Sequence, residues 1–371
     1  MGKIDELIQQ YCPDGVEYIR LGEVAKVCRG TRVVKSQLSN EGYPVYQNCL
    51  TPMGYFDKTN CPGGTPFVIC GGAAGNVGYA DVDCWAADDC EYIIAGDGVC
   101  NRYIYYCLLV KKEYLTSKVR KASIPRLSPS VIKDLEIPLP PLPVQEEIVR
   151  ALDTFTKLQI ELQEELQARQ EQFLYYQDIL LNKSQYSKHI TIGELCIVKK
   201  GNTPIQKAKE GKYPLVATTM ERRSCDTFQF NANAVCIPLV SSRGHGVASL
   251  NHVYYQEGTF ALGNILCAVI PNDERVVKAK YLYYYLEYAK DYTLVPLMKG
   301  GANVSLHCSD IEKVKIPLPS LSEQERIISI LDHFDALTND LTQGLPAEIE
   351  ARQQQYEYYR DRLLTFKRKE A

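Results

Sequence analysis

Residues 137–146 read IPLPPLPVQE and residues 316–325 read IPLPSLSEQE, so one segment occurs twice at an offset of 179 residues. Each proline fixes its own φ and biases the residue before it towards an extended backbone. A helix can therefore begin only near the end of each segment. We expect long helices to start near residue 142 in the first copy and near residue 321 in the second.

The sequence after each of these segments carries an apolar residue every three or four positions, as on a helix face that packs against another helix. The first stripe contains Ile148, Leu152, Phe155, Leu162, Leu166 and Tyr176, and the second contains Ile327, Leu331, Phe334, Leu341 and Tyr359. Each stripe is the expected partner of the other. Because a helix of about 40 residues spans about 60 Å, the pair would act as a spacer. The alternative is that both are ordinary core helices of one globular domain.

The second helical segment contains four extra residues. The shared Ala-Arg-Gln and Tyr-Tyr pairs lie at 168–176 and 351–359, where the offset has grown to 183 residues. Glycine often ends a helix and proline often begins one. We therefore predict a break near Gly344–Pro346.

The stretches that precede the two helices also resemble each other. Residues 21–24 read LGEV and residues 192–195 read IGEL, and Gly30-Thr31 and Gly201-Asn202-Thr203 follow them at similar distances. Short apolar runs between glycines and polar turns predict a mixed α/β domain in each copy. We expect a lead-in helix over 1–18, a first domain over 19–141, a helical spacer over 142–185, a second domain over 186–320 and a second spacer over 321–371. The chain is thus predicted to be an α+β tandem repeat with a pseudo-twofold relation.

The overall charge hides a strong segregation along the chain. The net charge is −3, but residues 144–181 are acidic, whereas seven basic residues lie within 199–223 against Glu210 and Glu221. Fourteen cysteines occur without any C-x-x-C pair, which disfavours a zinc site. The sequence has no signal peptide and no apolar run of about 20 residues, so we expect a cytoplasmic protein.

Catalytic and cofactor motifs are not found. The glycine-rich run 71–78 precedes a predicted strand and turn rather than the helix N-terminus that a phosphate cradle needs. The five histidines show no spacing that suggests a nucleophile and a base. We therefore expect no catalytic residue, no metal and no cofactor in this chain.

Glycine loops flanked by polar side chains suit nucleic-acid contact, because glycine allows close approach and Arg, Asn, Gln and Ser donate to phosphates and base edges. The candidates in the first domain are Arg29, Thr31, Arg32, Lys35, Gln47, Asn48 and Asn76. Those in the second are Lys199, Lys200, Asn202, Thr203, Arg222, Arg223, Ser242, Arg243, His245 and Asn303. For any single residue the alternative is a solvated surface position, but the clustering in both copies favours nucleic-acid binding.

These features together resemble the specificity subunit of type I restriction–modification systems. The resemblance rests on Gln145-Glu146 and Gln324-Glu325 after the proline segments, on GLPAEI at 344–349, on YEYY at 356–359 and on DGVEY at 14–18. It implies two target-recognition domains separated by an antiparallel coiled coil, each domain reading one half of a split asymmetric site in double-stranded DNA. The coiled coil would set the spacing between the half-sites.

The same resemblance implies the partners. Two modification subunits and usually two restriction subunits would dock on this scaffold, carrying S-adenosylmethionine, ATP and magnesium, while this chain remains non-catalytic. The competing interpretation is a coiled-coil scaffold that binds protein partners, and it predicts only weak, sequence-blind affinity for DNA.

Overall fold

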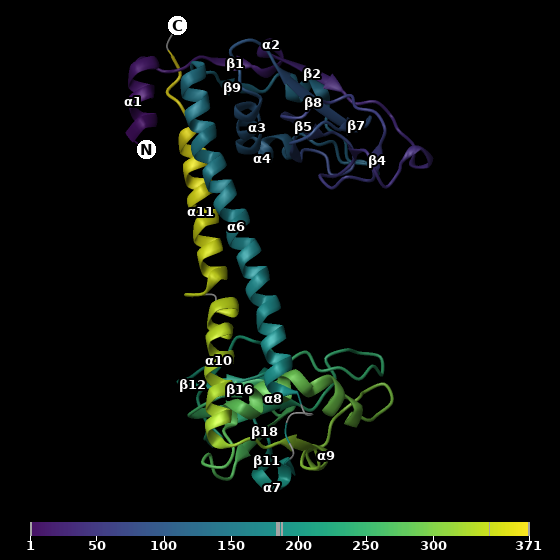
Figure 1. The fold of residues 1–371 in the computed structure, drawn as a ribbon, viewed down its shortest axis with the longest axis vertical. Helices are drawn as coiled ribbons and strands as arrows, with labels where there is room; N and C mark the ends of the chain where they lie inside the picture. Colours follow the sequence, from purple (N-terminus) through teal and green to yellow (C-terminus); the bar gives the residue numbers. More distant parts are fainter. Residues whose placement is uncertain (1, 183–185, 187, 341, 370–371) are drawn as a thin grey trace. The chain divides into compact units, whose positions relative to one another are not determined.

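The computed structural model describes residues 2–182, 186, 188–340 and 342–369, and the chain forms two compact units (Figure 1). Unit 1 comprises Met1–Gln163 with Ile349–Ala371, and unit 2 comprises Glu164–Glu348. Each unit contains one mixed α/β domain and a pair of helical segments, as the two-copy sequence pattern predicts.

Unit 1 is built on an antiparallel sheet of four strands in the order β2 (Ala25–Arg29), β8 (Cys90–Ala95), β5 (Thr65–Ile69) and β6 (Val77–Ala80). A smaller sheet has the order β4 (Tyr55–Phe56), β3 (Tyr43–Tyr46) and β7 (Trp85–Ala86), and β1 (Tyr18–Arg20) pairs with β9 (Glu136–Pro138). The helices of this domain are α1 (Gly2–Tyr11), α2 (Leu21–Val24), η1 (Lys35–Gln37), α3 (Asn101–Val110), α4 (Lys112–Ser117) and α5 (Pro129–Lys133).

Unit 2 repeats this plan. Its main sheet has the order β11 (Cys196–Lys200), β18 (Leu266–Pro271), β15 (Ala234–Pro238) and β16 (Tyr254–Gln256). Its second sheet has the order β13 (Arg223–Cys225), β12 (Tyr213–Val216), β17 (Thr259–Leu262) and β14 (Phe230–Asn231), and β10 (His189–Thr191) pairs with β19 (Lys315–Pro317). The helices are α7 (Ile192–Leu195), η3 (Ile205–Lys207), α8 (Ala279–Thr293), η4 (Val295–Leu297) and α9 (Cys308–Ile311). The matching strand orders confirm the tandem repeat.

Each proline segment begins in an extended conformation, as its prolines predict, and its first two residues lie in a short strand. Ile137 in β9 pairs with Ile19, and Ile316 in β19 pairs with Ile190. Both Ile137 and Ile316 are fully buried. Each strand thus anchors the entry to a long helix in the core of its own domain.

The long helix α6 (Leu142–Leu181) contributes to both units. In unit 1 it runs antiparallel to α11 (Leu345–Leu363): Phe155 stacks on Tyr359 with ring centroids 5.5 Å apart, and Gln159 donates to Gln353 one turn further on. In unit 2 it packs on α10 (Leu321–Asn339), where the Tyr176 ring lies 5.4 Å from that of Phe334. The predicted pairing of the two apolar stripes therefore occurs within each unit.

The members of these stripes differ in burial. Ile148, Leu152, Ile327 and Leu331 are fully buried in the domain cores, while Leu162 and Leu166 are half-buried. Leu341 lies outside the described residues. The stripe residues are therefore most deeply buried near the start of each helix, where the helix adjoins its domain.

The second helical segment is interrupted between Asn339 and Leu345. The Gly344 N–H donates to the Asp340 carbonyl at 3.0 Å. A Cβ at Gly344 would lie 2.7 Å from the carbonyl oxygens of Ala336 and Asp340 and 2.9 Å from that of Leu337. Only glycine fits this approach without a shift of the backbone.

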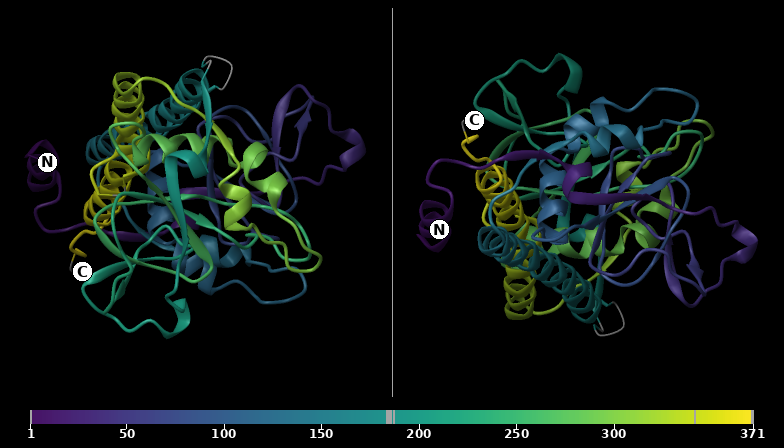
Figure 2. Two further views of the ribbon diagram at one scale, coloured as in Figure 1. Left: turned by 90° about the horizontal axis from the view of Figure 1, so that it is seen from below. Right: turned by 90° about the horizontal axis from the view of Figure 1, so that it is seen from above.

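A segment near each end of the chain pairs with the other in unit 1, where Val16 forms a β-bridge with Arg368, and Figure 2 shows the purple and yellow segments close together. The Val16 N–H donates to the Lys367 carbonyl at 2.8 Å, and the Tyr18 hydroxyl donates to the Phe366 carbonyl at 3.0 Å. Gly15 has a φ of +104°, and a Cβ there would lie 2.6 Å from the Lys367 carbonyl oxygen. The segment after α11 thus pairs with the N-terminal segment that leads into the first domain.

Candidate nucleic-acid interface

A glutamine at the start of each long helix holds the adjoining domain. Gln145 is fully buried; its carbonyl accepts from the Cys100 N–H at 3.0 Å, and its amide donates to the carbonyls of Gly98 and Pro140. Gln324 is equally buried and makes the same three contacts. The glutamine of the repeated Gln-Glu pair is thus a structural clamp in both units.

A second clamp joins the tyrosine-rich helix of each domain to an aspartate on the long helix. The Tyr106 hydroxyl donates to Asp153 at 2.5 Å, and the Tyr284 hydroxyl donates to Asp332 at 2.5 Å. Burial raises the pKa of both tyrosines far above the ordinary value, so the hydroxyls remain protonated donors. Arg102 adds an ion pair to Asp153.

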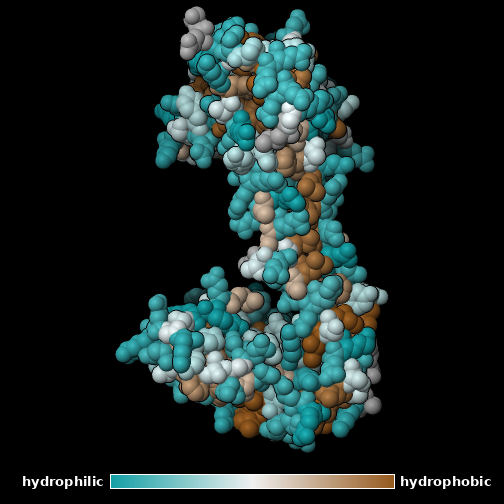
Figure 3. Space-filling view, turned by 90° about the vertical axis from the view of Figure 1, so that its left-hand side faces the viewer, coloured by the Kyte–Doolittle hydropathy of each residue, from teal (hydrophilic) through white to brown (hydrophobic). Residues whose placement is uncertain are grey.

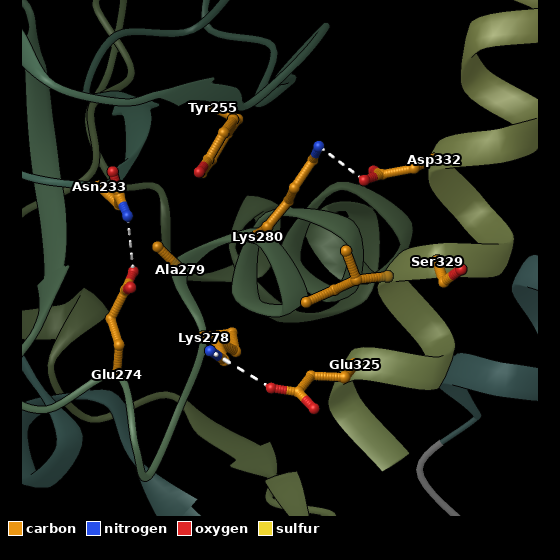
Figure 4. A pocket seen from close by; sticks show the side chains of 10 residues that line it. Asn233, Tyr255, Glu274, Lys278, Ala279, Lys280, Glu325, Ser329 and Asp332 are labelled. Carbon is orange, nitrogen blue, oxygen red and sulfur yellow. Dashed lines mark hydrogen bonds and ion pairs between the residues drawn. The ribbon is translucent and has the colours of Figure 1, made fainter. Parts of the chain in front are cut away.

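In unit 2 this junction surrounds a cavity of about 490 Å³ (Figure 4). Two ion pairs cross between α8 or its lead-in and α10: Lys278 lies 3.4 Å from Glu325, and Lys280 lies 2.8 Å from Asp332. On the domain side, Asn233 donates to Glu274 at 3.1 Å. These charges are mutually satisfied, which fits a joint between domain and helix better than a ligand site.

The predicted glycine loops occupy equivalent places in the two units. Gly30 follows β2 and donates to the Cys90 carbonyl, and Gly201 follows β11 and donates to the Leu266 carbonyl, both at 2.9 Å. A Cβ on Gly30 would lie 2.0 Å from the Ala87 oxygen, and one on Gly201 would lie 2.2 Å from the Gly263 oxygen. Glycine is therefore required at both positions by close backbone approach.

A second pair of loops meets beside each main sheet. In unit 1 the glycine-rich turn after β5 joins a hairpin over residues 120–126, since Gly72 donates to the Pro125 carbonyl. In unit 2 the loop after β15 joins a hairpin over 299–305, since Ser241 donates to the Val304 carbonyl at 3.0 Å. These two loops form one surface at the same place in each repeat.

Arg29, Thr31, Asn48 and Asn76 lie in or beside these loops. Arg29, Thr31, Arg32, Lys35 and Asn48 are exposed, and Gln47 and Asn76 are half-buried. Backbone contacts bring Asn48 to the glycine-rich turn, where its carbonyl accepts from Ala73 at 2.9 Å. No contact among the described residues joins Lys35 to the hairpin.

The second-domain candidates fall into two groups. Ser242, Arg243 and His245 lie in the loop after β15, and the Asn303 hairpin is beside them through the Gly246–Ala302 hydrogen bond. Lys199, Lys200, Asn202 and Thr203 lie on β11 and in the turn that follows it. His245 has a φ of +61°, so this loop tip adopts a left-handed conformation.

Two arginines of this set already have protein partners. The Arg222 guanidinium donates to Gln256 Oε1, to the Tyr255 carbonyl and to the Met220 carbonyl, all within 3.1 Å. Arg223 donates to the Ile205 carbonyl at 2.9 Å and is otherwise exposed. Arg222 therefore has less capacity for a phosphate than Arg223 or Arg243.

Four basic residues in the unit 1 hairpin or just before it were not among the candidates. Lys118, Arg120, Lys121 and Arg126 are all exposed, and no acidic residue interrupts the segment 118–126. A charge count over short windows would have found this segment, because its basic density, four residues in nine, exceeds the seven in twenty-five of the basic stretch in the second domain. Only the fold shows that it adjoins the glycine-rich turn.

Other site types find no support among the described residues. No group of acidic, histidine and cysteine side chains there could hold a metal ion, and none of the described helices is long and apolar enough to cross a membrane. All cysteines are free. Cys308 is half-buried against Cys267, and this contact lowers the pKa of Cys308 to about 7.

Known proteins share this architecture. Residues 13–172 and 186–351 each match the family described as "Type I restriction modification DNA specificity domain". A putative type I restriction enzyme specificity subunit of Haemophilus influenzae is 32% identical, covering 95% of this chain and 96% of that protein. The EcoR124I/EcoR124II specificity subunit of Escherichia coli is 31% identical, covering 96% and 95%.

Solved structures agree on the fold. The crystal structure of the S subunit of a type I restriction–modification system from M. genitalium superposes with a TM-score of 0.66 at 18% identity, covering 94% of this chain and 96% of that one. With both halves matched and relatives aligned end to end, the chain belongs to the family of type I restriction–modification specificity subunits.

Proposed function

We propose that each unit of this chain reads one half of a bipartite, asymmetric DNA site, and that the long helices set the spacing between the halves. The observation that carries the proposal is the duplicated loop surface. Both units present the turn after the first strand of the main sheet, a glycine or serine loop and a hairpin, with Arg29 and Lys200 at equivalent positions. Cations on glycine loops supply phosphate contacts, and the variable polar side chains beside them supply base contacts.

The helices supply docking sites for two modification subunits. Tyr175 is 63% exposed in unit 2 and Tyr358 is 59% exposed in unit 1, at equivalent positions of the repeat. Ile160 and Leu174 add exposed apolar surface, and apolar side chains interrupt the mainly hydrophilic surface of the helices in Figure 3. Exposed aromatic and aliphatic side chains are typical of protein interfaces. A duplicated surface supports two copies of one partner.

The chemistry belongs to those partners in this proposal. The modification subunits would bind S-adenosylmethionine and methylate adenine, and restriction subunits would use ATP and magnesium, all on double-stranded DNA in the cytoplasm. This chain supplies recognition only. A scaffold that binds protein alone is disfavoured by family membership, because the matched domains are described as DNA specificity domains.

The test is methylome sequencing of host cells with and without this gene. We expect the deletion to remove one bipartite motif that carries methylated adenine on both strands, and restoration of the gene to bring the same motif back. An unchanged methylome, in cells where the modification subunit is expressed, would contradict the proposal.

A further inference from the structure

Unit 1 contains a cavity of about 380 Å³ that lies between the end of the β2–β8 pair and the basic hairpin. Its wall combines opposite charges: Arg29, Arg120 and Arg126 line it together with Asp88, Asp89 and Glu91. Arg29 and Glu91 are direct neighbours across the β2–β8 ladder. The cavity therefore opens within the loop surface that the proposed function assigns to DNA.

Two of the three acidic side chains lack a partner. Glu91 is only 4% exposed, and no hydrogen bond or ion pair to its carboxylate occurs among the described residues. Asp88 has a buried carboxylate oxygen without a hydrogen-bond partner. Asp89, in contrast, pairs with Arg126 at 3.2 Å.

A buried carboxylate without a partner destabilises a folded protein. Burial accordingly raises the pKa of Glu91, although the positive charges of Arg29 and Lys133 act in the opposite direction. The position is therefore unfavourable for folding.

The second repeat shows that the fold does not need these acids. Glu91 faces Arg29 in the ladder of unit 1, and Cys267 faces Lys200 in the matching ladder of unit 2. The chain reaches these strands through the same turn, in which Cys90 donates to Ala87 and Leu266 donates to Gly263. By this register, Asn264 and Ile265 replace Asp88 and Asp89.

The basic residues are better preserved between the repeats than the acids. Arg29 corresponds to Lys200, and Arg120, which pairs with Arg126 across its hairpin, corresponds to Lys299, which pairs with Ser305. A feature present in both units suits the phosphate backbone, which is the same for both half-sites. A feature present in one unit suits the base sequence, which differs between them.

Carboxylate oxygens accept hydrogen bonds but cannot donate them, so in the major groove, where guanine and thymine present no donor, they select the bases with an exocyclic amino group on that edge. We propose that this cavity receives an amino-bearing base, cytosine or adenine, of the half-site read by unit 1, with Glu91 and Asp88 as acceptors and Arg29 and Arg120 on the adjoining phosphates. This inference rests on the proposed function of the chain. A metal ion is a poorer occupant, because three arginines line the same space.

The experiment selects duplexes from a random-sequence library with the full-length chain bound to its modification subunits. We expect the wild-type complex to enrich a bipartite motif with an invariant amino-bearing base at one position of one half. Glu91→Gln keeps the shape but adds a donor, so its preference at that position should fall about tenfold while every other position is retained. The buried, ion-paired Glu147 gives the matched control, and Glu147→Gln should select the wild-type motif.

A second arm removes the amino group from the DNA instead. A duplex with 2-pyrimidinone in place of cytosine, or purine in place of adenine, at the identified position should bind the wild-type complex about tenfold more weakly, and Glu91→Gln equally well with or without the amine. The base is cytosine if 2-pyrimidinone shows this effect and adenine if purine shows it.

The outcomes separate the two proposals. If the wild-type complex selects no motif, the proposed function fails. If it selects a motif that Glu91→Gln leaves unchanged, this inference alone is overturned. A loss of preference over both half-sites with a lower melting temperature would mark Glu91 as structural and would also overturn it.

Discussion

Gln145 and Gln324 show how one buried polar side chain can fix an element. Each satisfies three backbone groups of its own domain from the first turn of a long helix. Because a buried donor or acceptor that loses its partner retains its desolvation cost, such residues matter more than their single contacts suggest.

Gln145→Ala is expected to lower the free energy of unfolding by about 1–3 kcal/mol. The physical reason is that the Cys100 N–H and the carbonyls of Gly98 and Pro140 would lose their partner inside the protein. Urea denaturation followed by circular dichroism measures the change. Gln163 lies exposed on the same helix, and Gln163→Ala should change stability by less than about 0.5 kcal/mol; equal effects of the two variants would contradict the clamp.

Glu147 predicts an acid-sensitive contribution to stability. Hydrogen bonds from Arg150 and Lys3 lower its pKa from 4.5 to about 2 in the folded chain. The stabilisation is therefore fully present above pH 4.5 and is lost as the pH falls towards 2. Urea midpoints measured across this range should fall less steeply in Glu147→Gln than in the wild type. Parallel curves for the two proteins would show that the ion pairs contribute nothing.

At this scale the sequence indicated which residues repeat but not what they contact. Asp153 and Asp332 directly follow Leu152 and Leu331 of the two apolar stripes, yet their tyrosine partners lie 47 and 48 positions earlier in the chain. Long-range contacts of this kind depend on tertiary packing, which local periodicity does not encode. The unpartnered state of Glu91 was inaccessible for the same reason.

Elements were easier to predict than contacts. Apolar residues at intervals of three and four fixed the long helices, and the prolines fixed their starts, since both effects are local. The order of strands within each sheet was not predicted, because β-pairing joins distant segments. Thus β2 lies next to β8 in the sheet although five other strands, β3 to β7, lie between them in the sequence.

Gly344→Ala tests the break between α10 and α11. The added methyl group would meet three carbonyl oxygens within 2.9 Å, so the turn must shift or the last turn of α10 must unwind. We expect a loss of about 1–3 kcal/mol in the free energy of unfolding, measured by urea denaturation. Gly301 has open space at its Cβ position, and Gly301→Ala serves as the control. A stabilising effect of Gly344→Ala would mean that the break is not required.

For the whole molecule, the separation of acidic and basic residues in both repeats explains how a chain of net charge −3 can bind DNA. The acidic residues gather on the long helices and the cations gather on the loops of both domains, so each function has its own surface. Sequence similarity between the halves predicted two equivalent domains, and the strand orders confirm them. The replacement of the three acidic residues of the unit 1 cavity by neutral residues in unit 2 emerges only when the two repeats are compared residue by residue.

If both units contact the same duplex, the salt dependence of binding should divide between them. Arg120 in unit 1 and Lys200 in unit 2 are exposed on equivalent loop surfaces. Arg120→Ala and Lys200→Ala should each reduce the slope of log K against log salt by about 0.9, and the double variant by about twice that value, because each lost phosphate contact releases one counterion fewer. Fluorescence anisotropy of the full complex on labelled duplex, between low and moderate salt, measures the slopes. Lys157→Ala on the acidic helix should leave the slope unchanged, since Lys157 is exposed beside Glu161. A double variant no different from one of the single variants would mean that only one unit touches DNA.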